Sequence, residues 1–492
     1  MVNAAKQHTL TKKLFFPVFV LAGAIWFSCM TKGDPELGIK KIETAFAGGN
    51  FNAVERLADS LKSIQGCDTL LAARIDSLQD LAMRIRLDFS LSEKEISERL
   101  TTVIGDFSEE EKAEWERSNQ LEWRMIDGEM RYFNRAATNL KRILAYETRM
   151  REREKREIPD DFDLFKIKHA QSVVESAGGT FTLEEPVSLH LKYTLTVKAD
   201  AVPAGETIRC WMPWPREIHP RQQEVRLIRT MPDKHVIAPD TVQQRSLYLE
   251  KPAVAGEPTV FGVEFIYRSM AQYADPASLP TGPPTTTPHG EEFTSEQRPH
   301  ILFTEKIVKL SESIVGDESD QLKIVRRIFN WIDTNIPWAG APEYGTIPNI
   351  PEYVIDNRRG DCGMKTLLFM TLARYNRIPV KWQSGWMLHP GEVNLHDWCE
   401  VWYDGVGWVP LDMSFGRLPS REDRIRDFYM TGIDAYRLIV NDNIGKQFFP
   451  AKKYPRSEPN DFQRGEVEWR GGNLYFDKWN YHMEVNYQPS AY

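Results

Sequence analysis

The hydrophobic pattern of this 492-residue chain changes its period at Gly178-Gly179. Before these glycines, apolar residues recur at every third or fourth position, which is the pattern of amphipathic helices. Between Phe181 and Tyr273 they occupy alternate positions, which is the pattern of half-buried strands. A chain of this length also exceeds what a single compact core accommodates. The pattern therefore predicts a multidomain α+β protein in which a helical domain precedes a β-rich one.

Changes in composition mark the expected domain boundaries. Gly48-Gly49-Asn50 separates two helical runs, so the helical domain begins with an α-hairpin. A later stretch rich in Pro and Thr has the composition of a linker. The expected segments are a signal peptide over residues 1–29, a helical domain over 34–178, a β-sandwich-like domain over 180–274, a linker over 275–295, an α+β core over 296–440 and a β-rich C-terminal extension over 441–492. The helical domain could hold a protein partner or cover a site in the core, and the sequence favours neither.

The N-terminus has the features of an export signal. Lysines precede an apolar run over residues 14–27, which is shorter than the ~20 residues of a membrane-spanning helix. With Cys29 following directly, the segment resembles a bacterial lipoprotein signal, although Trp26 and Phe27 stand where that signal prefers Leu and a small residue. The resemblance implies an exported protein lipidated on Cys29 and anchored to a membrane of the bacterial cell envelope, facing the periplasm or the cell surface. The alternatives are an uncleaved anchor, or plain export with Cys29 removed.

Charge and motif content exclude several classes of protein. The formal net charge of −8 argues against a nucleic-acid partner, which would favour a clustered basic surface. We find no His/Cys cluster with zinc-ligand spacing, no EF-hand loop and no P-loop in the sequence, and expect neither a metal nor a cofactor. Beyond Cys29, the cysteines are too scattered for the disulfide framework of a small secreted domain: Cys67, Cys210, Cys362 and Cys399.

Cys362 stands where a thiol can react. Arg359-Gly360-Asp361 interrupts the chain just before it and a strongly apolar run to Tyr375 follows, so we expect Cys362 at the N-terminus of a helix. The unsatisfied amides and the positive dipole end there favour a thiolate and lower the cysteine pKa. The same amides are candidates for stabilising an oxyanion. The alternative is a structural cysteine, which would more often lie inside the helix.

Two downstream strands supply the expected partners. His396 begins one strand, the turn at Asp404-Gly405 reverses the chain, and Asp412 closes the returning strand. His396 and Asp412 therefore come within hydrogen-bonding reach, and the aspartate can fix the imidazole tautomer and stabilise the imidazolium. The local alternatives are less suitable, because Asp361 more readily caps the helix, Asp397 points away from the face of His396, and Asp404 belongs to the turn.

This stretch resembles the bacterial branch of the transglutaminase-like superfamily. That family has a Gly-x-Cys at a helix start, then a His-x-Trp strand and a Gly-Trp-Val-x-Leu-Asp strand. They are matched by Gly360-Asp361-Cys362, by His396-Asp397-Trp398 and by residues 407–412, within a region that spans about 304–415. The resemblance implies a papain-like α+β core in which Cys362 is the nucleophile, His396 the base and acid, and Asp412 the orienting group.

The activity that the resemblance implies is acyl transfer. An acyl group from a peptide or protein amide would pass to Cys362 as a thioester, and then to water or an amine. We expect hydrolysis, because water is far more concentrated than any amine and no amine subsite can be identified. The expected substrates are peptides, proteins or cell-wall peptides. Trp338 or Tyr344 could add an oxyanion-hole donor or line the pocket, or simply pack. The alternative is a binding or scaffold lipoprotein with an idle core.

Overall fold

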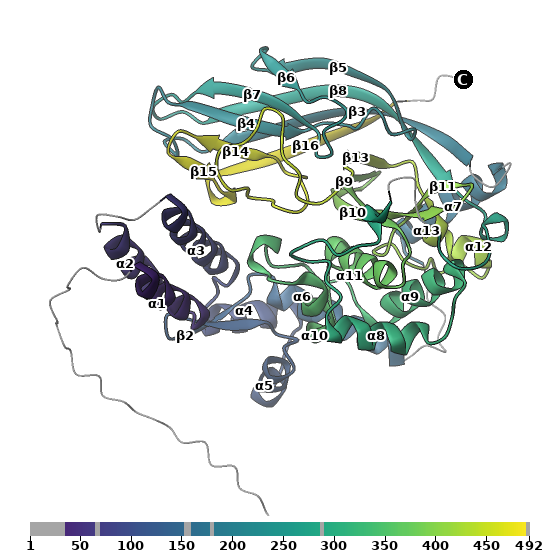
Figure 1. The fold of residues 1–492 in the computed structure, drawn as a ribbon, viewed down its shortest axis with the longest axis horizontal. Helices are drawn as coiled ribbons and strands as arrows, with labels where there is room; N and C mark the ends of the chain where they lie inside the picture. The colour runs from purple at the N-terminus through teal and green to yellow at the C-terminus, as the bar shows by residue number, and fades with distance from the viewer. Residues whose placement is uncertain (1–34, 64–68, 152–158, 178–181, 286–289, 489–492) are drawn as a thin grey trace, which may run out of the picture.

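The computed structural model describes residues 35–63, 69–151, 159–177, 182–285 and 290–488. A helical part, a pair of β-sheets, and a core of helices and sheet lie against one another (Figure 1), so the predicted multidomain α+β architecture is confirmed. The expected signal peptide and Cys29 lie outside the described residues, as does Cys67. Among the helices that are described, none is long and apolar enough to cross a membrane.

The first part of the chain is helical, as its periodicity predicts. Asn50 caps the second helix by accepting a hydrogen bond from the Ala53 amide at 3.1 Å. Gly49 makes the turn before it, with φ of +69°, and a Cβ there would lie 2.2 Å from the Met125 carbonyl oxygen. The helices are α1 (Pro35–Ala47), α2 (Phe51–Lys62), α3 (Thr69–Asp88), α4 (Glu93–Val103), α5 (Glu109–Arg117) and α6 (Ala136–Arg151).

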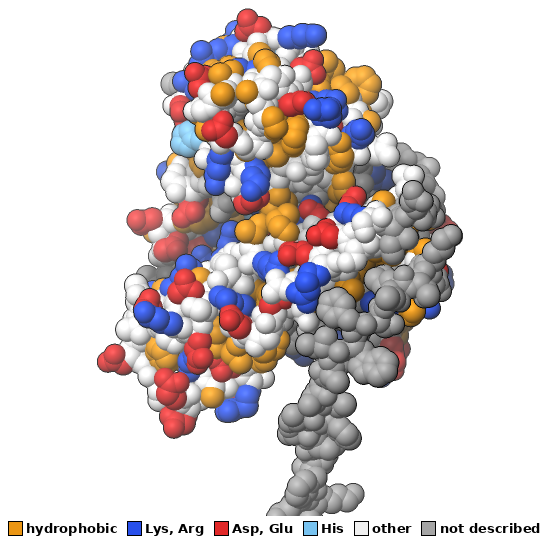
Figure 2. Space-filling model, turned by 90° about the vertical axis from the view of Figure 1, so that its left-hand side faces the viewer, with side chains coloured by type: hydrophobic (Ala, Val, Ile, Leu, Met, Phe, Trp, Pro, Cys, Tyr) orange, Lys and Arg blue, Asp and Glu red, His pale blue; other side chains and the backbone are white. Residues whose placement is uncertain are grey.

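A β-hairpin interrupts this helical part, which the sequence analysis did not predict. Strands β1 (Trp123–Ile126) and β2 (Glu129–Tyr132) pair antiparallel around Asp127-Gly128, both of which have positive φ. An Asp-Gly pair between short strands is the turn that a two-residue hairpin needs. Figure 2 shows the end of the molecule near this part, where basic and acidic side chains are interspersed, as expected of solvated helix faces.

Helix α7 (Asp161–Ser176) packs away from the other helices. Ala170, Val173 and Val174 bury their side chains against a cluster that includes Phe428 and Tyr429, far along the chain. The expected helical domain over 34–178 is therefore not one packing unit, because the apolar face of α7 is complementary to the core and not to α1–α6.

The β-rich part consists of two five-stranded sheets that share one hydrophobic core. Strands from the end of the chain complete both sheets, so the expected extension over 441–492 is not a separate unit. The strands are β3 (Thr182–Val197), β5 (Gln222–Met231), β8 (Thr259–Tyr273), β12 (Gly432–Ile433) and β16 (Trp479–Gln488) in one sheet, and β4 (Thr207–Pro213), β6 (His235–Ile237), β7 (Ser246–Pro252), β14 (Glu466–Trp469) and β15 (Gly472–Leu474) in the other. Cys210 is buried in β4, opposite Val467, as a small core side chain.

The core that follows packs helices against a four-stranded sheet of order β11-β10-β9-β13. The expected linker before it is partly packed, since Leu279 and Phe293 are buried. The elements are α8 (Glu305–Val315), α9 (Gln321–Asn335), α10 (Ile350–Asn357), α11 (Cys362–Tyr375), β9 (Val380–His389), β10 (Glu392–Tyr403), β11 (Gly407–Leu411), α12 (Asp423–Arg426), α13 (Phe428–Thr431) and β13 (Arg437–Asn441). Helix α10 was not predicted, because its surroundings read as a Pro/Gly-rich loop.

Helix α11 is the centre of this core. Its side chains from Gly363 to Arg374 are all buried, by α8, α9, α10 and one face of the sheet. A helix that is apolar on every side belongs in an interior, and each fully buried Leu or Phe contributes about 1.5–3 kcal/mol. This burial fixes the helix axis and so fixes where its first residue, Cys362, can lie.

Candidate active site

Cys362 is the first residue of α11, as predicted. Asp361 precedes it as the N-cap and accepts a hydrogen bond from the Met364 amide at 3.1 Å. Asp361 and Cys362 are partly accessible, whereas the rest of the helix down to Arg374 is buried. Cys362 therefore lies at an accessible end of α11.

His396 and Asp412 are hydrogen-bonded, also as predicted. His396 Nε2 lies 2.7 Å from Asp412 Oδ2, and both side chains are buried. Asp412 Oδ1 in turn accepts from the amides of Ser414 and Phe415, which fixes the carboxylate. One expectation was wrong: His396 does not begin its strand, because β10 starts at Glu392 and pairs with β9 along its whole first half.

The electrostatics of this pair favour a neutral imidazole beside a carboxylate. Burial lowers the pKa of His396, and the attraction of Asp412 does not offset it. Burial would raise the pKa of Asp412, but His396 and Arg437 outweigh it and lower that pKa to about 2. Because Nε2 donates to Asp412, Nδ1 is left as the basic nitrogen.

The thiol of Cys362 has a different partner, Asp397. Cys362 Sγ lies 3.2 Å from Asp397 Oδ2, and no hydrogen bond joins Cys362 to His396 in the described chain. Since neighbouring residues of a strand point to opposite faces, Asp397 does face away from His396, as predicted. What the sequence did not reveal is that this opposite face is the one that packs on α11.

The protonation state of Cys362 also differs from the expectation. Burial, followed by the carboxyl groups of Asp397 and Asp361, raises its pKa well above the usual value. The pKa of Asp397 is itself raised, by burial and by the nearby Asp461 and Asp361. The helix N-terminus would lower the pKa of Cys362, but its effect is smaller than that of desolvating the sulfur and placing carboxyl groups beside it. Both shifts favour the protonated form of each group.

Replacing Asp397 with Asn is expected to make Cys362 more reactive towards iodoacetamide. In the wild type, the ionisation of Asp397 and that of Cys362 are coupled, because the negative charge on one group disfavours the loss of a proton from the other. With an amide in place of the acid, the pKa of Cys362 falls. Each pKa unit by which it falls raises the thiolate fraction, and with it the alkylation rate at pH about 8, by about tenfold. The measurement is the alkylation rate of the Cys362 peptide against pH, with Asp404→Asn in the exposed turn as control. A slower reaction would instead make Asp397 the base of the thiol.

Gly363 and Gln463 complete the surroundings of Asp397. A Cβ on Gly363 would lie 2.8 Å from Asp397 Oδ2 and 2.2 Å from the Tyr344 hydroxyl, so only glycine allows this approach. Gln463 Nε2 donates to Asp397 Oδ1 at 2.7 Å and to the His396 carbonyl at 2.8 Å. The sequence analysis missed both residues, and Gln463 comes from the segment taken for a separate extension.

Tyr344 and Trp338 lie on the loop before α10, and only Tyr344 reaches the site. Its hydroxyl donates to Asp361 Oδ1 at 2.5 Å, beside Gly363. Trp338 pairs through its backbone with Gly360, but its ring lies under the guanidinium of Arg142 at 4.4 Å. Tyr344 therefore borders the nucleophile, whereas Trp338 packs against the helical part with 36% of its surface exposed.

A buried arginine, Arg437, forms an ion pair with the Asp412 of the His396–Asp412 pair. Arg437 Nη1 lies 3.0 Å from Asp412 Oδ2, and its Nη2 lies 2.7 Å from Asp434 Oδ2. Asp434 Oδ1 in turn lies 3.0 Å from Nε2 of His389. The guanidinium thus bridges two His–Asp pairs in a fully buried network. Nothing local in the sequence around Arg437 indicates this role, which depends on β13 pairing with β9.

The helical part fixes the backbone that leads to Cys362. Asn139 exchanges two hydrogen bonds of 2.8 Å with the Gly340 peptide. Glu122 pairs with Arg359 at 3.0 Å and accepts from the Tyr353 hydroxyl at 2.7 Å. These contacts are buried, so the helical part positions the loop before α10 and the residues that lead into Cys362. Binding of a further protein by the helical part stays a prediction.

The remaining expectations concern metals and cysteines. Within the described ranges, no group of three or more His, Cys, Asp or Glu side chains is arranged to hold a metal ion. Cys399 is buried on the strand of His396 and Cys210 is buried in the sandwich, both as free thiols. Cys362 is the one described cysteine with accessible surface.

Comparisons with known proteins identify the family of this core. The family model of the transglutaminase-like superfamily matches residues 308–413, which include Cys362, His396 and Asp412. No curated protein matches the chain significantly.

Solved structures give more distant similarities. A candidate cysteine protease from Cytophaga hutchinsonii is 14% identical, with a TM-score of 0.42, over 63% of this chain and 94% of its own. The periplasmic domain of TgpA from Pseudomonas aeruginosa is 12% identical, with a TM-score of 0.26, over 54% of this chain and 97% of its own. A candidate protease from Parabacteroides distasonis is 9% identical, with a TM-score of 0.20, over 56% and 66% of the two chains. Similarities at this level do not establish a shared activity. Residues 308–413 are a transglutaminase-like domain.

Proposed function

We propose that the chain is an exported, lipid-anchored cysteine enzyme that hydrolyses peptide or protein amides through a thioester on Cys362. The observation that supports it most is the accessible thiol at the N-terminus of α11, beside the strand whose His396 is hydrogen-bonded to Asp412 at 2.7 Å. A thiol nucleophile, a base and a group that orients the base are the parts that acyl transfer requires. Export and anchoring are supported by the apolar N-terminal run that ends at Cys29.

The first chemical step is attack of Cys362 Sγ on the amide carbonyl carbon. His396 takes the thiol proton on Nδ1, and the Asp412 carboxylate stabilises the imidazolium. In the structure His396 lies on the opposite face of β10 from Asp397 and Cys362, so this step requires a rearrangement that moves the thiol from Asp397 to the imidazole. The amides of Cys362 and Gly363 have no partner within the helix and can donate to the oxyanion, because Asp361 caps only the Met364 amide.

The second half of the cycle releases both products. The imidazolium of His396 donates its proton to the amide nitrogen, the C–N bond breaks and the amine leaves a thioester on Cys362. Water then attacks the thioester with His396 again as the base, which releases a carboxylic acid and restores the thiol. Water is the preferred acceptor because its concentration exceeds that of any amine.

A binding or scaffold protein with an idle core is the second candidate. It is favoured by one observation: the hydrogen-bond partner of the thiol is Asp397, and burial together with the nearby carboxyl groups raises the pKa of Cys362, which disfavours the thiolate. In that case the helical and β-sheet parts would bind a partner and the thiol would do no chemistry.

The proposed functions differ in whether the acyl group passes to water, to an amine or to neither. Peptide, protein and cell-wall peptide substrates are incubated with the full chain, with and without a fluorescent primary amine, and new carboxyl and amine termini are identified by mass spectrometry. We expect hydrolysis products that Cys362→Ala abolishes and Cys210→Ala leaves unchanged. Amine incorporation in excess of hydrolysis would make the enzyme a transferase, and no product from any substrate would favour the idle core.

A further inference from the structure

A pocket of about 460 Å³ lies beside Tyr344, where loops from the sandwich and the core meet. Its volume lies within the range of roughly 300–1,000 Å³ that ligand pockets have. It is lined by Gln297, Arg298, Pro299, His300, Tyr344, Gly345, Ile347, Ile444, Gly445, Lys446, Pro459 and Asn460. No lining residue is acidic, which sets this pocket apart from the carboxyl-rich surroundings of the thiol.

Two cations of the lining have no partner of opposite charge. Arg298 is exposed and Lys446 is partly buried, and neither forms an ion pair with any residue in the described part of the chain. His300 adds no charge, because burial lowers its pKa to about 4; its Nδ1 accepts from the Ile350 amide, and its Nε2 pairs with the Asn460 amide group at 2.9 Å. The pocket therefore carries a positive charge that the protein itself does not neutralise.

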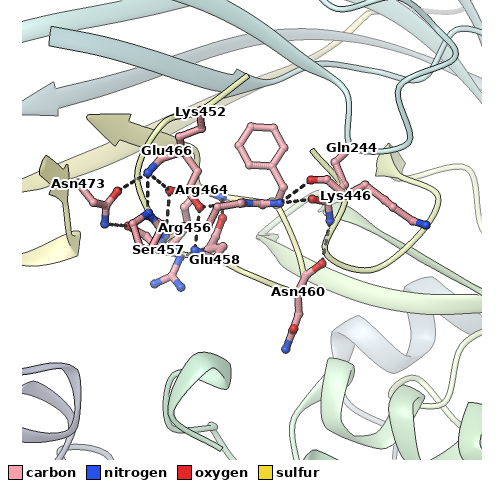
Figure 3. Close-up of polar contacts among 12 residues, drawn as sticks. Gln244, Lys446, Lys452, Arg456, Ser457, Glu458, Asn460, Arg464, Glu466 and Asn473 are labelled. Carbon is pink, nitrogen blue, oxygen red and sulfur yellow. Dashed lines mark hydrogen bonds and ion pairs between the residues drawn. The ribbon is translucent and has the colours of Figure 1, made fainter. Parts of the chain in front are cut away.

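Two neighbouring arginines are paired with acidic side chains, whereas Lys446 is not. Arg456 pairs with Glu466 at 3.2 Å, and Arg464 pairs with Glu458 at 2.5 Å. Figure 3 shows these pairs, with the side chain of Lys446 extending away from them. Lys446 is therefore available to a ligand or to solvent.

The side chain of Tyr344 lies between the pocket and the residues next to Cys362. Tyr344 lines the pocket, and its hydroxyl donates to Asp361 and borders Gly363, the residue after Cys362. A peptide whose scissile amide lies at Cys362 can therefore place a nearby group in the pocket. Peptide groups of negative charge are carboxylates, and arginine and lysine are the side chains that bind them.

We propose that this pocket, through Arg298 and Lys446, binds a carboxylate of the peptide substrate close to the scissile amide. The proposal rests on the proposed peptide hydrolysis. The carboxylate is that of an acidic side chain or of the peptide C-terminus, and in either case the pocket selects anionic peptides.

The test measures binding without turnover. Full-length Cys362→Ala protein is titrated with three fluorescent hexapeptides: one with an internal Glu and an amidated C-terminus, the same peptide with Gln, and the Gln peptide with a free C-terminal carboxylate. We expect one or both carboxylate peptides to bind about tenfold more tightly than the neutral one, as expected for a charge-assisted pair. Adding Arg298→Ala or Lys446→Ala should remove most of that preference, whereas Lys234→Ala, an exposed cation of the sandwich, should leave it intact.

The arms separate the outcomes. Tighter binding of the Glu peptide identifies a side-chain carboxylate, and tighter binding of the free C-terminus identifies the terminal one. Equal binding of all three peptides, no binding of any, or an equal loss in Lys234→Ala would overturn the pocket. If carboxylate peptides bind more tightly but the wild type cleaves no peptide, the proposal for the pocket holds and the proposed hydrolysis is wrong. If the wild type cleaves peptides but shows no preference for a carboxylate, the proposed hydrolysis holds and the proposal for the pocket is wrong.

Discussion

Replacing Asp412 with Asn is expected to lower kcat/KM on a peptide amide by about 10³- to 10⁴-fold. Asn cannot stabilise the imidazolium of His396, and its amide group can donate to Nε2, which would hold the imidazole in the wrong tautomer. Because Asp412 raises the pKa of His396, its loss should also move the acid limb of the pH profile to lower pH. Initial rates across pH measure both effects.

The control for this variant is Asp404→Asn, which changes a carboxylate in the exposed turn that follows β10, the strand of His396. It should leave both the rate and the pH profile unchanged. A purely structural role for Asp412 would lower the amount of folded enzyme without moving the acid limb. An Asp412→Asn enzyme with wild-type kcat/KM would exclude His396–Asp412 as the base pair.

Replacing Arg437 with Met is expected to destabilise the protein by about 3–5 kcal/mol, the cost of breaking a buried ion pair from one side. Arg437 is fully buried, bridges Asp412 and Asp434, and lies over the Phe415 ring at 4.2 Å. Methionine fills much of the volume but leaves two buried carboxylates without their cation. The measurement is the urea midpoint at neutral pH.

The control is Arg326→Met, because Arg326 is half-exposed and pairs with Asp427 at 3.0 Å; it should cost less than about 1 kcal/mol. Acid should lessen the Arg437→Met deficit. In the wild type, the low pKa values of Asp412 and Asp434 add stability at neutral pH that is lost as pH falls through them. In the variant those carboxyls take up protons at higher pH, so the deficit should shrink as the pH falls towards about 2, the pKa of Asp412 in the wild type. A deficit independent of pH would contradict the ion-pair account.

The elements that carry the site could be predicted because their signals are local. A capping aspartate before an apolar run placed Cys362 at a helix start, and the hairpin around Asp404-Gly405 brought His396 to Asp412. Helix α10 had local signals too, since Asn349 caps it and Pro351 stands in its first turn. Its Pro/Gly-rich surroundings outweighed them.

Features that depend on long-range packing could not be predicted. The contact between Asp397 and Cys362 exists because α11 packs on one particular face of β10. The return of β16 to pair with β3 joins strands from distant parts of the chain, and no local pattern encodes that partner. The raised pKa of Cys362 has the same origin, because burial and neighbouring carboxyls are properties of the folded chain and outweigh the helix end.

The central claim is that Cys362 becomes acylated during turnover. The wild-type protein is mixed with a peptide that carries a reactive ester, quenched in acid after one half-turnover, and digested for mass spectrometry. We predict that the acyl mass lies on the peptide that contains Cys362, that hydroxylamine removes it as a thioester, and that His396→Ala slows its appearance. An acyl group on another residue, or turnover with no acyl group on Cys362, would contradict the account.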